Sequence, residues 1–272
     1  MIVCEISAKV FLGGGAYNCK VTLFGGIRAV KLGIITDVHA NLEALETVLR
    51  VLEARRVDYI ACLGDVVGYG GQPEECCTLV RKYADVTVVG NHDAAVSRRM
   101  DYAYYRQAAR DALDRHRAMV SESNYEWLAS LPYSARLGSV EFCHGVPPDF
   151  KAFEYLFSLD QTVQLSATFS ERAHVTFVGH SHLCKSFRYT PDMGEEILRT
   201  RFEIGANHKY IISAGSVGQP RDYDSRSCCG IYDTLTGQFE YVRSHYDIQS
   251  AAQRIAEADL SEAFGRRLFL GV

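Results

Sequence analysis

The chain has 272 residues, of which 47% are hydrophobic and 23% are charged, and its formal net charge is −4 at pH 7. A chain of this length forms one large domain or two small ones, and it can bury an extensive core without disulfide bonds. The net charge excludes a global basic field, which argues against a dedicated DNA- or RNA-binding protein, and no stretch reaches the ~20 apolar residues of a membrane span.

Residues 1–28 precede the part of the chain that carries regular hydrophobic patterns. Glycines at 13–15 and 25–26 interrupt the apolar residues of this leader, and no compact apolar segment with a basic flank is present. We therefore do not expect a signal peptide, and we expect a cytoplasmic protein. The leader is expected to be an extension outside the core fold, with an additional edge hairpin as the alternative.

From residue 31 onward, short apolar segments alternate with amphipathic ones. Residues 31–36 predict a buried strand, and residues 41–56 predict a helix because their leucines and valines recur at helical spacing. A second strand is expected at 59–63, a helix that starts with a proline at 73–83, and a third strand at 86–89. This alternation indicates βαβ units and an α/β core.

The second half of the chain mixes helical and extended patterns. Residues 97–130 are predicted to be helical and residues 146–172 irregular or helical, with strands at 139–143 and 174–178. Further short strands separated by turn residues suggest a second, largely antiparallel sheet, followed by an amphipathic C-terminal helix. These strands are expected at 185–189, 210–213, 230–232 and 238–243, and the helix at 248–258.

No internal repeat, low-complexity tract or linker divides the chain after the leader. We therefore expect a single catalytic domain at residues 29–272, with helical insertions near 94–135 and 146–172. These insertions would shape the substrate pocket.

The nine cysteines of the chain do not form a disulfide pattern. Their number is odd, two pairs are adjacent in sequence, and several lie in apolar segments. No CxxC spacing is present, which argues against a zinc ribbon or a thioredoxin-like site. We expect buried free thiols.

Five predicted strands end in residues that can bind a metal ion. Ligands of open α/β sheets bind beyond the carboxyl ends of the strands, so these five ends are expected to meet in one crevice. They are Asp37-Val38-His39, Gly64-Asp65, Gly90-Asn91-His92-Asp93, His144-Gly145 and Gly179-His180-Ser181-His182.

The residue types at these strand ends fit a transition-metal site. Imidazole nitrogen and carboxylate oxygen together suit Mn, Fe, Zn or Co, and the Asp-x-His and His-x-His spacings place both ligands on one side of an extended segment. A single Asp after a strand is more often a helix N-cap, and a single GNHD can be a turn. Their joint occurrence favours a metal site. The remaining histidines are expected to be structural or exposed: His116, His174, His208 and His245.

The five segments resemble the motifs of the calcineurin-like metallophosphoesterase superfamily. The family pattern is D-x-H, G-D-x-x, G-N-H-[DE], H and G-H-x-H, and this chain reads DVH, GDVV, GNHD, CHG and GHSH within residues 31–245. The resemblance implies an α/β fold, a four-layer α/β/β/α sandwich of two mixed β-sheets flanked by helices. It also implies two divalent transition-metal ions, which could be Mn, Fe, Zn, Co or Ni.

The resemblance assigns the metal ligands motif by motif. Asp65 would bridge the two metals. The first metal would be held by Asp37, His39 and His182, and the second by Asn91, His144 and His180.

The resemblance also implies a phosphoester hydrolase mechanism. A hydroxide that bridges the metals would attack phosphorus. His92 would contact the phosphate and act as general acid toward the leaving group, with Asp93 orienting it.

Two longer stretches resemble a bacterial and archaeal branch of small phosphodiesterases, the YfcE-like group. They are GDVVGYG at residues 64–70 and GSVGQPRD at residues 215–222. Some members of that branch cleave dinucleoside polyphosphates or nucleotide phosphodiesters, so we expect a small phosphoester substrate of nucleotide type. The serine/threonine protein phosphatases of the superfamily carry an arginine where this chain has Gly68-Tyr69-Gly70, which argues against protein dephosphorylation.

Two residues are candidates for substrate binding. Arg221 could reach a second phosphate or a nucleotide, or it could instead tie its loop to a neighbouring aspartate. Tyr69 could stack on a base, or it could be a core tyrosine. The aromatic and basic residues of 98–106 could form a lid, but an ordinary solvated helix is the interpretation we favour.

Two other functions compete with a small-molecule phosphodiesterase or phosphatase. A nuclease would need a basic groove with aromatic platforms, and the acidic total does not favour a nucleic-acid partner. A non-catalytic scaffold, as in retromer-type relatives, would be expected to lose metal ligands, whereas all seven are present here. No membrane partner is expected, and a homo-oligomer remains open.

Overall fold

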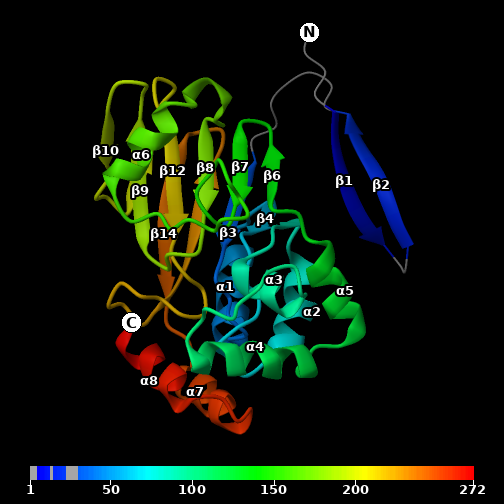
Figure 1. Ribbon diagram of the computed structural model, residues 1–272. Coiled ribbons are helices and arrows are strands. Elements are labelled where there is room, and N and C mark those ends of the chain that lie inside the picture. The colour runs from blue at the N-terminus through cyan, green and yellow to red at the C-terminus, as the bar shows by residue number, and fades with distance from the viewer. Residues whose placement is uncertain (1–4, 13–14, 23–29) are drawn as a thin grey trace.

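The computed structural model describes residues 5–12, 15–22 and 30–272, and two six-stranded mixed sheets form its centre (Figure 1). The first sheet combines strands from both ends of the chain. Strand β3 pairs parallel with β4 and antiparallel with β13, so its carboxyl end lies at the middle of the sheet. The order is β11 (Arg201–Glu203), β14 (Gln238–Ser244), β13 (Ser227–Asp233), β3 (Lys31–Ile35), β4 (Tyr59–Cys62) and β5 (Val86–Thr87).

The second sheet is built from the middle of the chain. Its strand β8 pairs parallel with β7 and with β12, while the outer strands pair antiparallel. The order is β10 (Gly194–Glu196), β9 (Cys184–Tyr189), β12 (Lys209–Ala214), β8 (Val175–Val178), β7 (Val140–Cys143) and β6 (Ser134–Leu137).

Alternating side chains on the strands explain why the two sheets stack. Ile34 of β3 and Phe177 of β8 enter one apolar core that both sheets share, whereas Ile35 packs into the core under the helices of the first sheet. On the second sheet, Val178 and Ile211 face a separate outer core that includes Leu165 of helix α6 (Leu159–Ser166). The predicted sandwich of two mixed sheets flanked by helices is therefore confirmed.

The prediction that the late strands form their own antiparallel sheet is wrong. Strands β9 and β12 join the second sheet, but β13 and β14 extend the first. The hydrophobic pattern could not separate these cases, because both sheets bury similar residues against the same central core.

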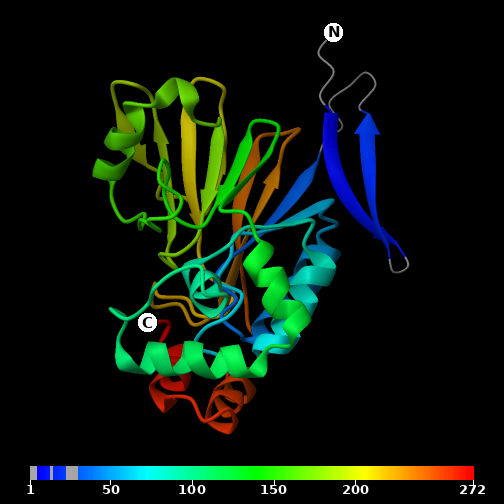
Figure 2. The same cartoon turned by 45° about the vertical axis from the view of Figure 1, so that its right-hand side comes forward.

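Helices cover the outer faces of the sheets and the end where the motif loops lie. In Figures 1 and 2, α1 and α2 lie with α3 and α5 beside the first sheet, α6 lies against the second sheet, and α7 and α8 lie together at the opposite end of the molecule from α6. The bounds are α1 (Leu42–Ala54), α2 (Pro73–Tyr83), α3 (Asn91–Val96), α4 (Gln107–Met119), α5 (Glu122–Ser130), α6 (Leu159–Ser166), a 3-10 turn (Phe169–Glu171), α7 (Ile248–Glu257) and α8 (Glu262–Leu270).

Two helical regions differ from the sequence-based expectation. The helix predicted over 97–130 is two helices, α4 and α5, preceded by a non-helical loop at 97–106. Helix α8 was not predicted, although it buries Phe264 and Leu268 in an apolar cluster that it shares with α7 and α4. Its pattern is short, and Gly265 in its middle weakens the helical signal.

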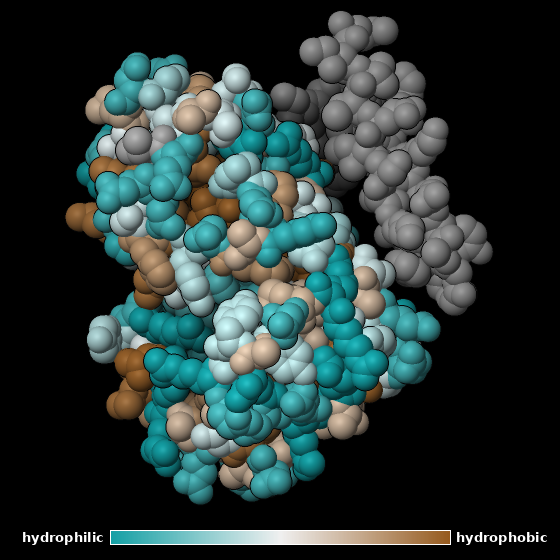
Figure 3. Space-filling view, in the orientation of Figure 1, coloured by the Kyte–Doolittle hydropathy of each residue, from teal (hydrophilic) through white to brown (hydrophobic). Residues whose placement is uncertain are grey.

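In the leader, β1 (Glu5–Leu12) and β2 (Gly15–Thr22) pair antiparallel as a separate two-stranded sheet, not as an edge of either main sheet. The prediction of a leader outside the core also covers residues that lie outside the described part of the chain. These are residues 1–4, 13–14 and 23–29. Across the described parts of the chain, no helix is both long and apolar enough to cross a membrane. The surface seen in Figure 3 is mostly hydrophilic, with hydrophobic residues in small separate groups.

The seven cysteines at positions 62 to 229 have free thiols, as predicted. Six of these are buried, and Cys184 is half-buried.

Candidate metal centre

Five candidate site residues in the loops that follow the strands have a positive φ angle, which is an unusual backbone conformation. Among residues with side chains, a positive φ is uncommon and costs roughly 1–3 kcal/mol, and it is seen most often at functional sites. Hydrogen bonds between loops hold this conformation: Asp37 N–H donates to Gly64 O at 3.0 Å, and His39 N–H donates to Asp65 O at 2.9 Å. The site residues with positive φ are Asp37 (52°), His39 (48°), Asp65 (50°), His180 (67°) and His182 (59°).

The loop at 215–222 supports the first motif from the other side. Ser216 Oγ donates to Asp37 O at 2.9 Å, and Gly218 N–H donates to the same carbonyl at 2.9 Å. A Cβ at Gly218 would lie only 1.8 Å from Val38 O, so the backbones can approach this closely only because position 218 is glycine.

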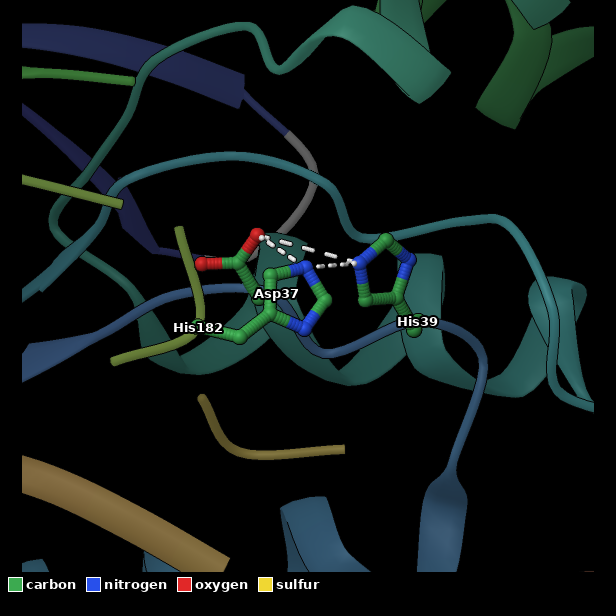
Figure 4. Close-up of side chains that lie close together, drawn as sticks. All are labelled: Asp37, His39 and His182. Atoms are coloured by element: carbon green, nitrogen blue, oxygen red, sulfur yellow. Dashed lines mark hydrogen bonds and ion pairs between the residues drawn. The ribbon is translucent and has the colours of Figure 1, made fainter. Parts of the chain in front are cut away.

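Asp37, His39 and His182 form one group of potential ligand atoms (Figure 4). His182 Nε2 lies 3.2 Å from Asp37 Oδ1, and His39 Nε2 lies 3.7 Å from the same oxygen. The two imidazole nitrogens are 3.1 Å apart. All three side chains are buried, so a small cation would be enclosed by protein atoms on this side.

Asp65, His144 and His180 form a neighbouring group. His144 Nε2 lies 3.3 Å from Asp65 Oδ2 and 3.1 Å from Asn91 Oδ1. The same oxygen of Asp65 lies 3.7 Å from His39 Nε2, so this carboxylate stands between the two groups. The structure thus brings together all seven residues that the sequence analysis selected as ligands.

Backbone carbonyls fix the orientation of three of the histidine rings. Nδ1 lies 3.0 Å from Val67 O in His39, 2.7 Å from Leu63 O in His144 and 2.6 Å from Gln219 O in His182. A carbonyl only accepts hydrogen bonds, so each Nδ1 must carry the proton in the neutral ring. The lone pair of each Nε2 then points into the site, as metal binding requires.

The donor set fits divalent metal ions. Asp37 Oδ1 is buried and has no hydrogen-bond partner among the described residues, whereas Asp37 Oδ2 accepts from Thr36 Oγ1 and His180 N–H. An unpartnered buried carboxylate oxygen is costly unless a cation faces it. Mixed imidazole and carboxylate donors suit Mn, Fe, Co or Zn better than Mg or Ca.

The charges of the metal-free site are strongly coupled. Burial opposes ionisation of Asp37, but His182, His144 and the Thr36 hydroxyl together outweigh it and lower the Asp37 pKa to about 2. Burial lowers the pKa of His144, but Asp65, Asp37 and the Leu63 carbonyl together outweigh this effect and raise it to about 9. In His39 and His180, burial keeps the pKa well below its usual range, so both rings are neutral at pH 7.

His92 lies at the rim of the two groups. One of its ring nitrogens falls within 4.8 Å of ligand atoms of His39 and Asp65, and its Nδ1 is buried with no hydrogen-bond partner among the described residues. Burial lowers the His92 pKa to about 4. A Cβ at Gly68 would lie 2.3 Å from His92 Nδ1, and a Cβ at Gly70 would lie 2.2 Å from His39 O, so no larger residue fits at either position.

The carboxylate of Asp93 is hydrogen-bonded to the backbone of the motif loops. Its Oδ1 accepts from the N–H groups of Val66 and Val67, and its Oδ2 accepts from Gly90 N–H at 3.0 Å. Both oxygens are therefore engaged by backbone, and neither is bonded to the ring of His92. Asp93 instead ties the second and third motif loops together.

The sequence analysis missed a contact to Asn91. Tyr105 Oη lies 2.6 Å from Asn91 Nδ2, which fixes the amide so that its Oδ1 faces His144. Tyr105 belongs to the loop for which an ordinary solvated helix was favoured, and that interpretation is wrong at this position. The sequence analysis had noted the aromatic residues of this segment, but no sequence periodicity could indicate that the loop folds over the site.

A cleft of about 910 Å³ opens beside the site. Tyr69 and Arg221, the two candidate substrate-binding residues, both line it, and the Arg221 guanidinium lies 5.6 Å from the Tyr69 ring. Arg221 does not tie its loop to the neighbouring aspartates, because Asp222 pairs with Arg243 and Asp224 with Arg226. Tyr69 is half-buried between His39 and Phe264.

The other histidines are structural or partly exposed, as expected. The buried His116 accepts from Gly68 N–H through Nδ1 and donates to Gly70 O through Nε2, so it braces the glycine loop. Neither His174 nor His208 nor His245 is fully buried, and none of them lines the cleft.

The chain is similar in sequence to known proteins. The sequence profile described as calcineurin-like phosphoesterase superfamily domain matches residues 30–237. A curated protein of Methanocaldococcus jannaschii, described as uncharacterized, is 34% identical over 246 residues, which cover 88% of this chain and 98% of that protein.

Two solved structures share the fold. The crystal structure of a metallophosphoesterase from Sphaerobacter thermophilus has a TM-score of 0.78 and 33% identity, and the match covers 90% of this chain and 100% of that one. A hypothetical protein from Pyrococcus horikoshii has a TM-score of 0.70 at 16% identity, covering 89% and 99% of the two chains.

Proposed function

This chain belongs to the calcineurin-like phosphoesterase superfamily and is a metal-dependent phosphoric ester hydrolase, and from that premise we propose that two divalent ions occupy its site. Asp37, His39 and His182 would hold one ion, and Asn91, His144 and His180 the other. The observation that carries this proposal is the position of Asp65 Oδ2, 3.7 Å from His39 Nε2 and 3.3 Å from His144 Nε2. An oxygen between two ligand groups is suited to bridge two cations.

Divalent ions in such a pair polarise phosphoryl oxygens and lower the pKa of water. The protein's own residues would orient the reactants around them. The Nδ1 contacts to Val67, Leu63 and Gln219 keep each imidazole in the tautomer that leaves Nε2 free. Burial of these side chains excludes bulk water from the donor atoms, which strengthens electrostatic interactions within the site.

His92 is proposed as the general acid. Its ring lies between the ligand groups and the cleft, and its Nδ1 has no hydrogen-bond partner among the described residues. A negatively charged phosphoryl group beside the ring would favour its protonated form, which is the form that can donate a proton to the departing oxygen.

The proposed substrates are small phosphodiesters or phosphomonoesters of nucleotide type. The cleft has the volume of a small-molecule site, and Tyr69 offers an aromatic face beside Arg221. The cytoplasmic location, manganese as the native metal and membership of the YfcE-like branch stay predictions from the sequence.

Replacing His92 tests the acid role. We expect His92→Ala to retain its metal and to keep most of its activity on bis-p-nitrophenyl phosphate, whose leaving group needs no proton. Its kcat on a nucleotide diester with an alkoxide leaving group should fall about 10²–10⁴-fold. Equal rates of variant and wild type on the alkoxide substrate would refute the general-acid role.

The substrate class requires a wider assay of the wild-type enzyme. Mn, Fe, Co, Ni, Zn and Mg should be crossed with phosphomonoesters, phosphodiesters, cyclic nucleotides, dinucleoside polyphosphates and phosphopeptides. We expect activity on small esters with a transition metal. Activity confined to phosphopeptides would contradict the proposal.

A further inference from the structure

Basic residues line the cleft together with the metal-binding residues. Asp65, Asn91, His92 and two ligand histidines are among the residues around its roughly 910 Å³. The 104–109 segment, the 221 loop and helix α8 supply further lining residues, and together they form the basic wall of the cleft. A ligand in the cleft would therefore touch the metal site and this wall at once.

Three arginines belong to the wall, and none of them pairs with an aspartate or glutamate side chain within 4.0 Å among the residues described. Arg221 Nη2 donates to Gln219 Oε1 at 2.8 Å, and Arg267 Nε donates to Val272 O at 2.7 Å. Arg106 is exposed and makes no side-chain hydrogen bond within the described chain. The nearby Arg226 and Arg243, by contrast, each pair with an aspartate outside the cleft.

The arginines are close enough to repel one another. Burial lowers the pKa of Arg267, and the charges of Arg221 and Arg106 lower it further. Arg221 Nε is also buried without a hydrogen-bond partner in the described part of the chain. Like charges gathered without an aspartate or glutamate partner are unfavourable until an anion neutralises them. Among the residues that line the cleft, Asp65 and Glu154 carry carboxylate side chains.

Packing holds the wall in place. Phe264 of α8 is buried and meets the Tyr69 ring edge-on at 5.0 Å, and Leu268 is buried in the cluster with α7. Tyr223 N–H donates to Gly271 O at 2.9 Å just after α8. The Arg267 side chain therefore rises from an anchored helix, which reduces the entropy cost of binding an anion.

We propose that Arg106, Arg221 and Arg267 form an anion subsite for a phosphate group of the substrate other than the one that is hydrolysed. The inference rests on the proposed function and narrows it to small phosphoesters that carry a second phosphate. Guanidinium groups suit this task because their planar N–H donors match phosphate oxygens in pairs.

The test compares two esters with the same leaving group. The p-nitrophenyl ester of thymidine 5′-phosphate carries one phosphate, and its 3′-phosphorylated counterpart carries a second. For the metal-loaded wild type we expect kcat/KM to be about tenfold or more higher for the second ester, since a charged hydrogen bond contributes at least that factor.

Arg267→Gln should lower this preference about tenfold, and Arg106→Gln, at an exposed position, should lower it in the same direction. Arg266→Gln is the matched control, because Arg266 is the next residue on α8 and pairs with Glu262 at 3.2 Å, away from the cleft. The control should keep the wild-type preference. A wild type that treats both esters alike, or arginine variants that keep its preference, would overturn the subsite.

A binding measurement separates this inference from the proposed function. Calorimetry on the metal-loaded protein should show tighter binding of adenosine 3′,5′-bisphosphate than of adenosine 5′-phosphate, with the difference reduced in Arg267→Gln. No turnover of either ester with any metal would contradict the proposed function, and the calorimetric difference would still decide the subsite. Equal binding of the two nucleotides would overturn it.

Discussion

At the scale of single residues, six of the seven proposed ligands, all but His180, keep one donor atom turned toward the site while another polar atom of the side chain binds the protein. Asp37 shows this division most clearly, because Oδ2 is hydrogen-bonded and Oδ1 is not. The three histidines bonded through Nδ1 repeat it. Such contacts raise the basicity of a ligand and fix its direction.

Asp65→Ala should abolish metal binding and activity together, because both proposed ions would share this carboxylate. Asp160→Ala, at an exposed position of α6, is the control and should behave as wild type. Metal content by mass spectrometry, together with kcat, checks the prediction. A variant that kept two ions per chain would contradict the bridging role.

Tyr105→Phe removes only the hydroxyl that lies 2.6 Å from Asn91 Nδ2. Loss of such an outer contact typically weakens metal affinity or activity about 10–100-fold, so we expect a loss in that range for one of the two ions. Metal titration of the variant measures it. Tyr125→Phe is the control, because the Tyr125 hydroxyl makes only a long 3.4 Å bond to Ser97 O and its loss should not change the titration. An unchanged titration of Tyr105→Phe would refute the positioning role of Tyr105.

Metal uptake should depend on pH through His144. Burial lowers the pKa of His144, but Asp65, Asp37 and the Leu63 carbonyl together raise it to about 9 in the metal-free protein, so at pH 7 an incoming cation must displace a proton. Apparent affinity should then rise about tenfold per pH unit from 7 to about 9 and level off above it. The same ion pair stabilises the metal-free fold fully below pH 6.5, and this contribution is lost as the pH rises through 9.

Calorimetry in buffers of different ionisation enthalpy measures this proton release. We expect about one proton from His144 at pH 7 and none from it above pH 9. Uptake at pH 7 without proton release would show that His144 is already neutral in the metal-free site.

At the scale of elements, the loops after the strands carry the chemistry, and neighbouring loops hold them in shape. The sequence predicted the five motif loops well, because apolar strands followed by Gly, Asp and His leave few alternatives. It did not predict that GNHD begins helix α3 or that Asp93 would bind the backbone of two loops. Those roles depend on contacts between loops far apart in sequence, which no local pattern encodes.

The lining of the cleft was the least predictable part. Helix α8 is short, and residues 97–106 resemble a helix in composition, yet both supply residues of the cleft wall. Their positions follow from packing against α7, α4 and Tyr69, as Phe264 shows. Tertiary contacts of this kind override local propensity.

Gly218→Ala should disrupt the first motif loop. Its Cβ would lie 1.8 Å from Val38 O and 2.7 Å from Val38 C, so the backbone between Asp37 and His39 would have to move. We expect a loss of stability of about 1–3 kcal/mol from overpacking and reduced metal affinity, measured by denaturant unfolding and metal titration. Gly205→Ala is the control and should have only a mild effect on stability and metal affinity, because the nearest neighbour of its Cβ would be Tyr210 Oη at 3.6 Å. Equal effects of the two substitutions would contradict the close-approach argument.

At the scale of the whole molecule, the sandwich explains why seven distant residues meet. Strands β3 and β4 of the first sheet and β7 and β8 of the second end on the same side of a shared apolar core. The motif resemblance predicted this architecture, whereas the hydrophobic pattern alone misassigned β13 and β14. The extent of the domain and its insertions stays a prediction.

The central claim is that one buried carboxylate, Asp65, joins two metal ions into a single hydrolytic site. Anomalous diffraction from crystals of the manganese-loaded protein tests it most directly. We predict two peaks about 3.5–4 Å apart, with Asp65 in contact with both and the Nε2 atoms of His39, His144 and His182 facing them. One peak alone, or two peaks without Asp65 between them, would contradict the account.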